Sequence, residues 1–189
     1  PIPTPFSIED LKLIDHLRLP AIKIASPDLV TRPLLHHAAQ LRKPILISTG
    51  ASTLEEIETT ITWLLEWNAP FALLHCLSAY PTPTHDANLC WITELANKFQ
   101  VPVGYSDHTN ELLAGALAVG SAAQIIEKHL TYDRAASGPD HAASFDPEQF
   151  KQYVGQIRVA DRLRGAPGRH VLSIERDVRK VSRQSLVLR

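Results

Sequence analysis

Two histidines stand at the ends of two short apolar segments, and their spacing is the first sign of chemistry in the sequence. His108 comes shortly after the apolar segment 101–105, and His129 comes shortly after the largely apolar segment 122–126. Short runs of this composition are typical of buried strands. Residues 110–120 between them have helical composition and end in glycine, which predicts two parallel neighbouring strands. Both imidazoles are then expected at the same end of the sheet, where they could hold a divalent metal.

Alternation along the two strands sorts the nearby polar residues into two faces. Ser106 is expected on the same face as His108, whereas Asp107 is expected to point the other way. In the second strand Lys128 is expected to face away from His129. Two histidines are too few for a closed structural metal site, and they leave positions for water and substrate. The alternative is a pair of buried structural histidines, and the spacing alone leaves both interpretations open.

Lys23 is a second candidate, because it lies inside the apolar segment 21–25. Burying its ammonium group is costly unless an anion pairs with it. The anion could be a phosphate or carboxylate of a ligand, or an acidic side chain on a neighbouring strand. Residues 48–50 precede a predicted helix whose first amides could bind the same ligand. His75 is different, since its position predicts a buried structural residue.

Bulk composition limits the class of protein. The 189 residues are 44% hydrophobic, which suits one domain with a real core, and the net charge of −1 offers no basic field for nucleic acid. No apolar run approaches the ~20 residues of a membrane helix, and no signal peptide is recognisable. The two cysteines, Cys76 and Cys90, lack metal-type spacing. A cytoplasmic protein that binds neither nucleic acid nor membrane is therefore expected.

Five strand candidates alternate with helices along the chain. The strands are expected at 21–25, 44–48, 71–77, 101–105 and 122–128, and the helices at 7–17, 32–41, 52–67, 88–99, 110–120 and 146–163. Strict alternation predicts a parallel sheet covered by helices, either doubly wound or a (β/α)8 barrel. No glycine-rich phosphate loop follows a strand, and polar residues end every strand, which favours the barrel. Five units make that TIM barrel incomplete. The chain begins without Met, so we expect a fragment.

Seven motifs occur in order across nearly the whole chain, and together they resemble the N-acetylneuraminate (sialic acid) synthase family. The motifs lie at 4–6, 23–26, 47–50, 74–81, 104–109, 126–129 and 138–144. The resemblance implies that residues 1–165 are a partial TIM barrel, from the end of strand 3 through strand 8. It also implies that residues 166–189 are a linker toward an absent antifreeze-like domain, in a parent that works as a domain-swapped homodimer.

The resemblance further implies an enzyme that condenses phosphoenolpyruvate with an N-acetylated aminosugar such as N-acetylmannosamine. A nine-carbon 2-keto acid and phosphate are the expected products. His108 and His129 are the implied ligands of Mn²⁺, with Mg²⁺ or Co²⁺ as alternatives, and Lys23 joins them as a catalytic residue. Lys23 is also one of the implied phosphoenolpyruvate contacts, which are Thr4, Lys23, Ser26, Ser48 and Ser106. The implied residues around the substrates are Ser78, Tyr80 and Asp140.

Two alternatives remain beside this function. Synthases of legionaminic and pseudaminic acid share the motifs, so the sequence does not identify the sugar. A non-catalytic remnant that binds a metal or a phosphosugar is the other alternative, because segments expected before Thr4 and after residue 189 are missing. The 189-residue chain by itself is expected to be inactive.

Overall fold

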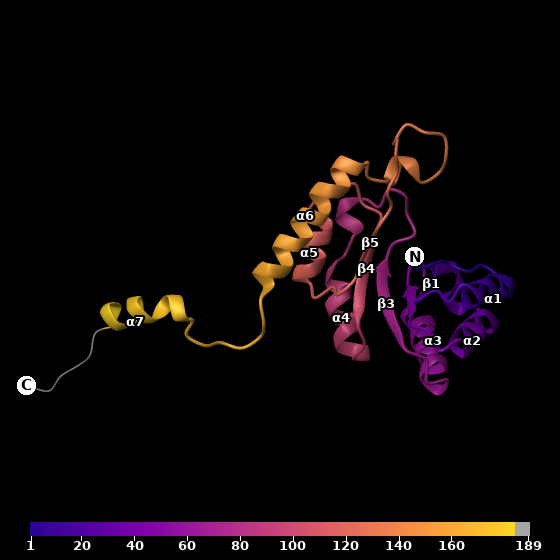
Figure 1. The fold of residues 1–189 in the computed structure, drawn as a ribbon, viewed down its shortest axis with the longest axis horizontal. Helices are drawn as coiled ribbons and strands as arrows, with labels where there is room; N and C mark the ends of the chain where they lie inside the picture. The colour runs from indigo at the N-terminus through magenta and orange to yellow at the C-terminus, as the bar shows by residue number, and fades with distance from the viewer. Residues whose placement is uncertain (184–189) are drawn as a thin grey trace, which may run out of the picture.

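The computed structural model describes residues 1–183 as an α/β fold built on one parallel sheet (Figure 1). The strands are β1 Ile22–Ile24, β2 Ile45–Ser48, β3 Phe71–Cys76, β4 Val103–Asp107 and β5 Ile126–Lys128. They pair in the order β1-β2-β3-β4-β5, and every pair is parallel. The predicted parallel sheet with sequential strand order is therefore confirmed.

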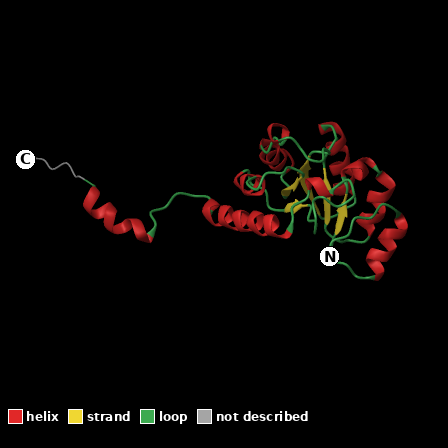
Figure 2. Cartoon of the chain, turned by 90° about the horizontal axis from the view of Figure 1, so that it is seen from above, coloured by secondary structure: helices red, strands yellow, loops and turns green. Residues whose placement is uncertain are grey.

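The helices alternate with the strands and surround them (Figure 2). They are α1 Ile8–His16, α2 Arg32–Gln40, α3 Leu54–Glu66, α4 Cys90–Phe99, α5 Ala114–Gly120, α6 Pro147–Arg164 and α7 Arg176–Ser182, with short 3-10 helices at Ser26–Val30, Thr84–Asp86, His141–Ala143 and Ser173–Glu175. Among residues 1–183, no helix combines the length and the apolar character needed to cross a membrane.

A single contact shows how strongly the sheet curls. β1 and β5 are its two edge strands. In a flat sheet they would lie roughly 19 Å apart, four strand spacings of about 4.8 Å. Yet Lys23 Nζ on β1 is 3.7 Å from Glu127 Oε2 on β5. The strands therefore form a curled half-barrel, which agrees with the predicted incomplete barrel, while the numbering of these strands within a full barrel stays a prediction.

The outward face of the first strands forms the main core with the helices. Ile22, Ile24, Ile45 and Ile47 are completely buried, and they belong to one hydrophobic cluster with side chains of α1 to α4. Branched side chains of this kind pack well on a pleated surface. The opposite face of the strands is thereby left to line the inside of the curl.

Local hydrogen bonds set the helix ends, and two predicted starts are wrong. The helix predicted at 52–67 begins at Leu54, where Thr53 and Glu56 cap it, and the Ser52 hydroxyl donates to the Gly50 carbonyl instead. The helix predicted at 110–120 begins only at Ala114. Before it, the amides of Thr109 and Glu111 bond to side chains two residues earlier. Such turns compete with helix formation.

Side chains cap α1 and α6, the helices predicted at 7–17 and 146–163. Ser7 Oγ accepts a hydrogen bond from the Asp10 amide at the start of α1. Asp146 and Gln149 form a reciprocal capping box at α6, with Pro147 in its first turn. Beyond α6, the chain carries α7 away from the sheet (Figure 1). The predicted linker 166–189 is described up to residue 183, and residues 184–189 lie outside the described residues.

Candidate functional site

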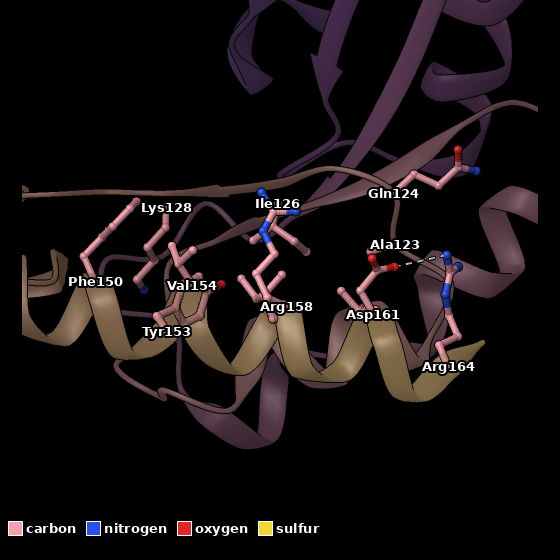
Figure 3. Close-up of a pocket in the computed structure, with 12 residues that line it drawn as sticks. Ala123, Gln124, Ile126, Lys128, Phe150, Tyr153, Val154, Arg158, Asp161 and Arg164 are labelled. Carbon is pink, nitrogen blue, oxygen red and sulfur yellow. Dashed lines mark hydrogen bonds and ion pairs between the residues drawn. The ribbon is translucent and has the colours of Figure 1, made fainter.

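A cavity of about 530 Å³ opens at the carboxyl ends of the strands, inside the curl. Every predicted site residue except Asp140 lines it: Thr4, Lys23, Ser26, Ser48, Ser78, Tyr80, Ser106, His108 and His129. A second cavity of about 470 Å³ lies on the outer side, between β5 and α6, and contains none of the predicted site residues (Figure 3). The candidate chemistry is therefore gathered on the inner face.

The two histidines that the sequence singled out lie side by side. The rings of His108 and His129 have centroids 5.3 Å apart and are inclined by 64°. His108 Nδ1 lies 2.7 Å from the Leu77 carbonyl, which can only accept, so this nitrogen carries the proton. Nε2 of His108 then keeps its lone pair. Burial lowers the pKa of His108, and the hydrogen bond to Leu77 opposes that shift.

This donor set fits a divalent cation. Imidazole nitrogens bind such ions at about 2.1 Å, so rings at this spacing can share one ion. A backbone carbonyl holding the other ring nitrogen, as Leu77 holds His108, is the usual support for a ligand histidine. Within residues 1–183, no group of three or more His, Cys, Asp and Glu side chains could hold a metal. The candidate site therefore offers His108 and His129 as protein ligands and leaves further positions for other molecules.

Tyr80 covers the histidine pair from the mouth of the cavity. Its ring centroid is 4.1 Å from that of His108 and 5.8 Å from that of His129. The loop that carries it is tied down by the Thr82 amide, which donates to the His108 carbonyl. Asp140 approaches from another loop, with Oδ2 3.9 Å from His129 Nδ1. Asp140 therefore lies beside His129 although it does not line the cavity.

Lys23 has protein partners on the floor of the same cavity. Its Nζ donates to Ser48 Oγ at 2.7 Å and to the Ile24 carbonyl at 3.2 Å, and it faces Glu127. An internal acid partner, one of the two alternatives raised by the sequence, is thus present. The Glu127 side chain is 39% exposed, so the pair lies open to the cavity and a ligand anion can also reach the ammonium group.

Ser26 and Ser78 approach each other across Gly50. The Gly50 amide donates to Ser26 Oγ at 3.0 Å. A Cβ atom at Gly50 would lie 2.5 Å from Ser78 Oγ and 2.8 Å from Ser26 Oγ, so only glycine leaves room for both hydroxyls. An anion contact with the first amides of the following helix stays a prediction. α3 begins at Leu54, and residues 53–56 do not line the cavity.

Six lining residues were missing from the predicted set, and two of them, Glu127 and Cys76, lie within reach of predicted residues. Glu127 Oε1 accepts a hydrogen bond from Ser106 Oγ at 2.7 Å. Glu127 is two residues before His129, so the two-residue period of a strand places both side chains on the same face. This periodicity could have identified Glu127 as a site residue. Cys76 also lines the cavity, with Sγ 3.5 Å from Ser26 Oγ, and burial raises the pKa of its thiol. The thiol therefore stays protonated near neutral pH.

His75 is structural, as predicted. It is buried on the outward face, Nε2 lies 2.8 Å from the Ala87 carbonyl, and its ring stacks on Tyr105 at 5.7 Å. Burial lowers its pKa, with the hydrogen bond to Ala87 opposing the shift. The alternation of β3 thus separates His75 from Cys76, which faces the cavity.

The sequence is similar to a defined family of synthases. The model of the NeuB family matches residues 1–168. An uncharacterized protein of Methanocaldococcus jannaschii is 43% identical, covering 98% of this chain and 56% of that protein. The N,N'-diacetyllegionaminic acid synthase of Legionella pneumophila is 38% identical, covering 98% of this chain and 54% of the enzyme. The chain thus spans about half the length of these relatives.

The fold is similar to a solved synthase structure. The sialic acid synthetase of Leptospira borgpetersenii, crystallised with citrate, superposes with a TM-score of 0.90 at 34% sequence identity. The match covers 96% of this chain and 65% of that chain. The curled five-stranded sheet is therefore shared with an enzyme of known fold.

Proposed function

The chain belongs to the NeuB family of sialic, legionaminic and pseudaminic acid synthases, and from this premise we propose that it carries the phosphoenolpyruvate and metal sites of such an enzyme. The proposed reaction joins phosphoenolpyruvate to an N-acetylated aminosugar, N-acetylmannosamine or a similar sugar. The observation that carries the proposal is the single cavity shared by the His108–His129 pair and the Lys23–Ser48–Glu127 cluster. One half suits a cation and the other half suits an anion.

We assign the cation to His108 and His129. A neutral imidazole whose Nε2 carries no proton, as in His108, is the form that binds a metal. Mn²⁺ is the proposed ion, with Mg²⁺ or Co²⁺ as alternatives. When bound, such an ion polarises the aldehyde carbonyl of the open-chain sugar as a Lewis acid.

We assign the phosphoenolpyruvate anion to the hydroxyls and the ammonium group around Lys23. Thr4, Ser26, Ser48 and Ser106 are the proposed companions of Lys23. Fixed donors of this kind hold the phosphate and carboxylate groups and orient the enol carbon toward the sugar. Tyr80, Ser78 and Asp140 surround the mouth, and they are the proposed contacts to the substrates, with Tyr80 and Asp140 on the sugar side.

The proposed bond changes involve the two substrates and one water molecule, whose two protons end on the new hydroxyl and on the released phosphate. The enol carbon of phosphoenolpyruvate forms a C–C bond with the aldehyde carbon, whose oxygen takes up a proton to become a hydroxyl. The adjacent carbon gains positive character and is captured by water. Loss of phosphate from that carbon then gives the 2-keto group of a nine-carbon acid. The role of this chain's residues is to bind and orient the two substrates, which can supply several kcal/mol of the barrier reduction.

The wider setting is part of the same proposal. A domain-swapped homodimer with an antifreeze-like domain is proposed for the whole protein, in a cytoplasmic location. The 189 residues by themselves are proposed to bind phosphoenolpyruvate and Mn²⁺.

The test separates binding from turnover. Isothermal titration of the chain with phosphoenolpyruvate, with and without Mn²⁺, measures binding, and the His108→Ala variant serves as the site variant. His36→Ala is the matched control, because His36 is exposed and does not line the cavity. Phosphate release is assayed for the chain and for a full-length version, against sugar precursors of sialic, legionaminic and pseudaminic acid.

The outcomes discriminate the candidate functions. Release with one precursor identifies the sugar. Binding without release in the full-length version supports a non-catalytic metal- or phosphosugar-binding remnant. If the chain binds neither phosphoenolpyruvate nor Mn²⁺, the proposed function is wrong.

A further inference from the structure

Behind the histidine pair, on the outward face of the sheet, lies a sealed ionic network. Asp107 on β4 and Lys128 on β5 are register partners, with Nζ 3.6 Å from Oδ2 and side chains 0% and 1% exposed. Tyr153 on α6 donates its hydroxyl to Asp107 Oδ2 at 2.7 Å. Figure 3 shows the Lys128 side chain reaching from its strand toward α6, beside Tyr153. The Lys128 ammonium also lies 4.2 Å from the Phe145 ring centroid.

The network holds the backbone on both sides of His108. Asp107 Oδ1 accepts a hydrogen bond from the Thr109 amide at 2.8 Å. Lys128 Nζ donates to the Thr109 carbonyl. The residue before His108 and the residue after it are thus connected to one ammonium group. That ammonium belongs to the residue immediately before His129, so the network links the backbones of the two histidines.

Stability is a poor explanation for these charges. Elsewhere on the outward face, the positions in β1 and β2 are fully buried isoleucines. A buried ion pair loses much of its Coulomb energy to desolvation, and apolar residues of the same volume often stabilise a fold at least as well. Directional bonds, unlike apolar contacts, define one geometry. Apart from His75 on β3, the buried polar side chains of this face therefore lie at the strand ends that carry His108 and His129.

A close helix contact holds Tyr153 in this arrangement. Gly115 on α5 lies against its ring, and a Cβ atom there would be 2.6 Å from both Cζ and Oη of Tyr153. The hydroxyl position thus depends on a glycine in a helix that does not line the site. Substitution of Gly115 displaces Tyr153 without changing any charge.

We propose that Asp107, Lys128 and Tyr153 are positioning residues that set the relative placement of the His108 and His129 rings. That the two rings bind a metal rests on the proposed function. That the network fixes the positions of the rings does not. Loss of the network is expected to let Thr109 and the following turn shift, and to move His108 relative to His129.

The test compares two variants of the network with one control variant. Tyr153→Phe removes one hydrogen bond from Asp107 and keeps both charges, and Gly115→Ala displaces the same hydroxyl from α5. Thr60→Val is the matched control, because it removes a buried hydroxyl that donates to the Leu29 carbonyl at 2.8 Å, far from the histidines in the fold. Each variant is measured by urea unfolding, by Mn²⁺ binding in electron paramagnetic resonance, and by ring-to-ring nuclear Overhauser contacts between Tyr80, His108 and His129.

We expect stability and site geometry to respond differently to the variants. All three variants lower stability, but only Tyr153→Phe and Gly115→Ala change the ring contacts and weaken Mn²⁺ binding, by about 10- to 100-fold. Unchanged ring contacts and Mn²⁺ affinity in both would overturn the proposal. If the unsubstituted chain binds no Mn²⁺, the metal part of the proposed function fails, and the ring contacts alone decide the positioning role.

Discussion

Two buried lysines lie on the two edge strands of the curled sheet, and each faces a carboxylate at nearly the same distance. Lys23 Nζ is 3.7 Å from Glu127, with side chains 10% and 39% exposed. Lys128 Nζ is 3.6 Å from Asp107, with both side chains sealed from solvent. The inner pair lines the cavity of about 530 Å³, whereas the outer pair is enclosed by Tyr153 and Phe145.

The difference shows what solvent access allows an ion pair to do. On the inner face, water and a ligand anion can compete for Lys23, so the pair costs little to separate. On the outer face no such substitute exists, and removal of either partner leaves an unpaired buried charge. A lysine–carboxylate pair is therefore suited to ligand binding on the inner face and to fixing the backbone on the outer face.

Asp107→Asn is expected to have the largest effect. It keeps the shape of the side chain but leaves the Lys128 ammonium buried without a counter-charge. The free energy of unfolding should fall by about 3–5 kcal/mol. Glu127→Gln is the inner-face control, and its cost should stay within about 1 kcal/mol, because that pair is partly exposed. Urea unfolding at pH 7 measures both, and equal losses would remove the distinction between the two faces.

His108→Ala and His129→Ala test the cation half of the inner face. Either change should lower Mn²⁺ affinity by at least about 100-fold, since two protein ligands cannot spare one. His36→Ala should leave the affinity unchanged. Titration of Mn²⁺ followed by electron paramagnetic resonance measures each variant. Undiminished affinity in both cavity variants would leave the two histidines as structural residues.

Lys23→Met tests the anion half of the inner face. Methionine keeps the length of the side chain and removes the charge, so phosphoenolpyruvate affinity should fall by about 10- to 100-fold, or ~1.4–2.7 kcal/mol. Stability should change by less than about 1 kcal/mol, because Glu127 can regain water. Calorimetric titration and urea unfolding are measured together. The opposite result, an unfolded chain with intact affinity in the folded fraction, would assign Lys23 to the internal ion pair alone.

The pH dependence of stability should show the smallest effect. Burial lowers the folded-state pKa of His75 below its unfolded value of about 6.5. The unfolded state therefore binds the proton more readily, and stability present above pH ~6.5 is lost as pH falls through the folded pKa. One histidine contributes at most about 1.4 kcal/mol per pH unit. Urea unfolding between pH 5 and 8 should give a shallower slope for His75→Gln, and an unchanged slope would contradict this assignment.

The sequence by itself determined the repeating order of the elements and the face of each residue near the site. Strand–helix alternation predicted the parallel sheet, and two-residue periodicity placed Ser106 and His108 opposite Asp107. The caps at Ser7 and Asp146 were also predictable. Each of these features depends on residues only a few positions apart, so a short stretch of sequence is enough to predict it.

Only the tertiary structure decided which of these residues meet. The start of α5 at Ala114 depends on Asp107 and Thr109, whose competing bonds to the next turn no periodicity displays. The Lys23–Glu127 contact joins the first and last strands and exists because the sheet curls. The bond from Tyr153 to Asp107 exists because α6 packs against α5 beside the sheet. Curl and helix packing arise from the summed twist and burial of the whole chain, so no local pattern specifies them.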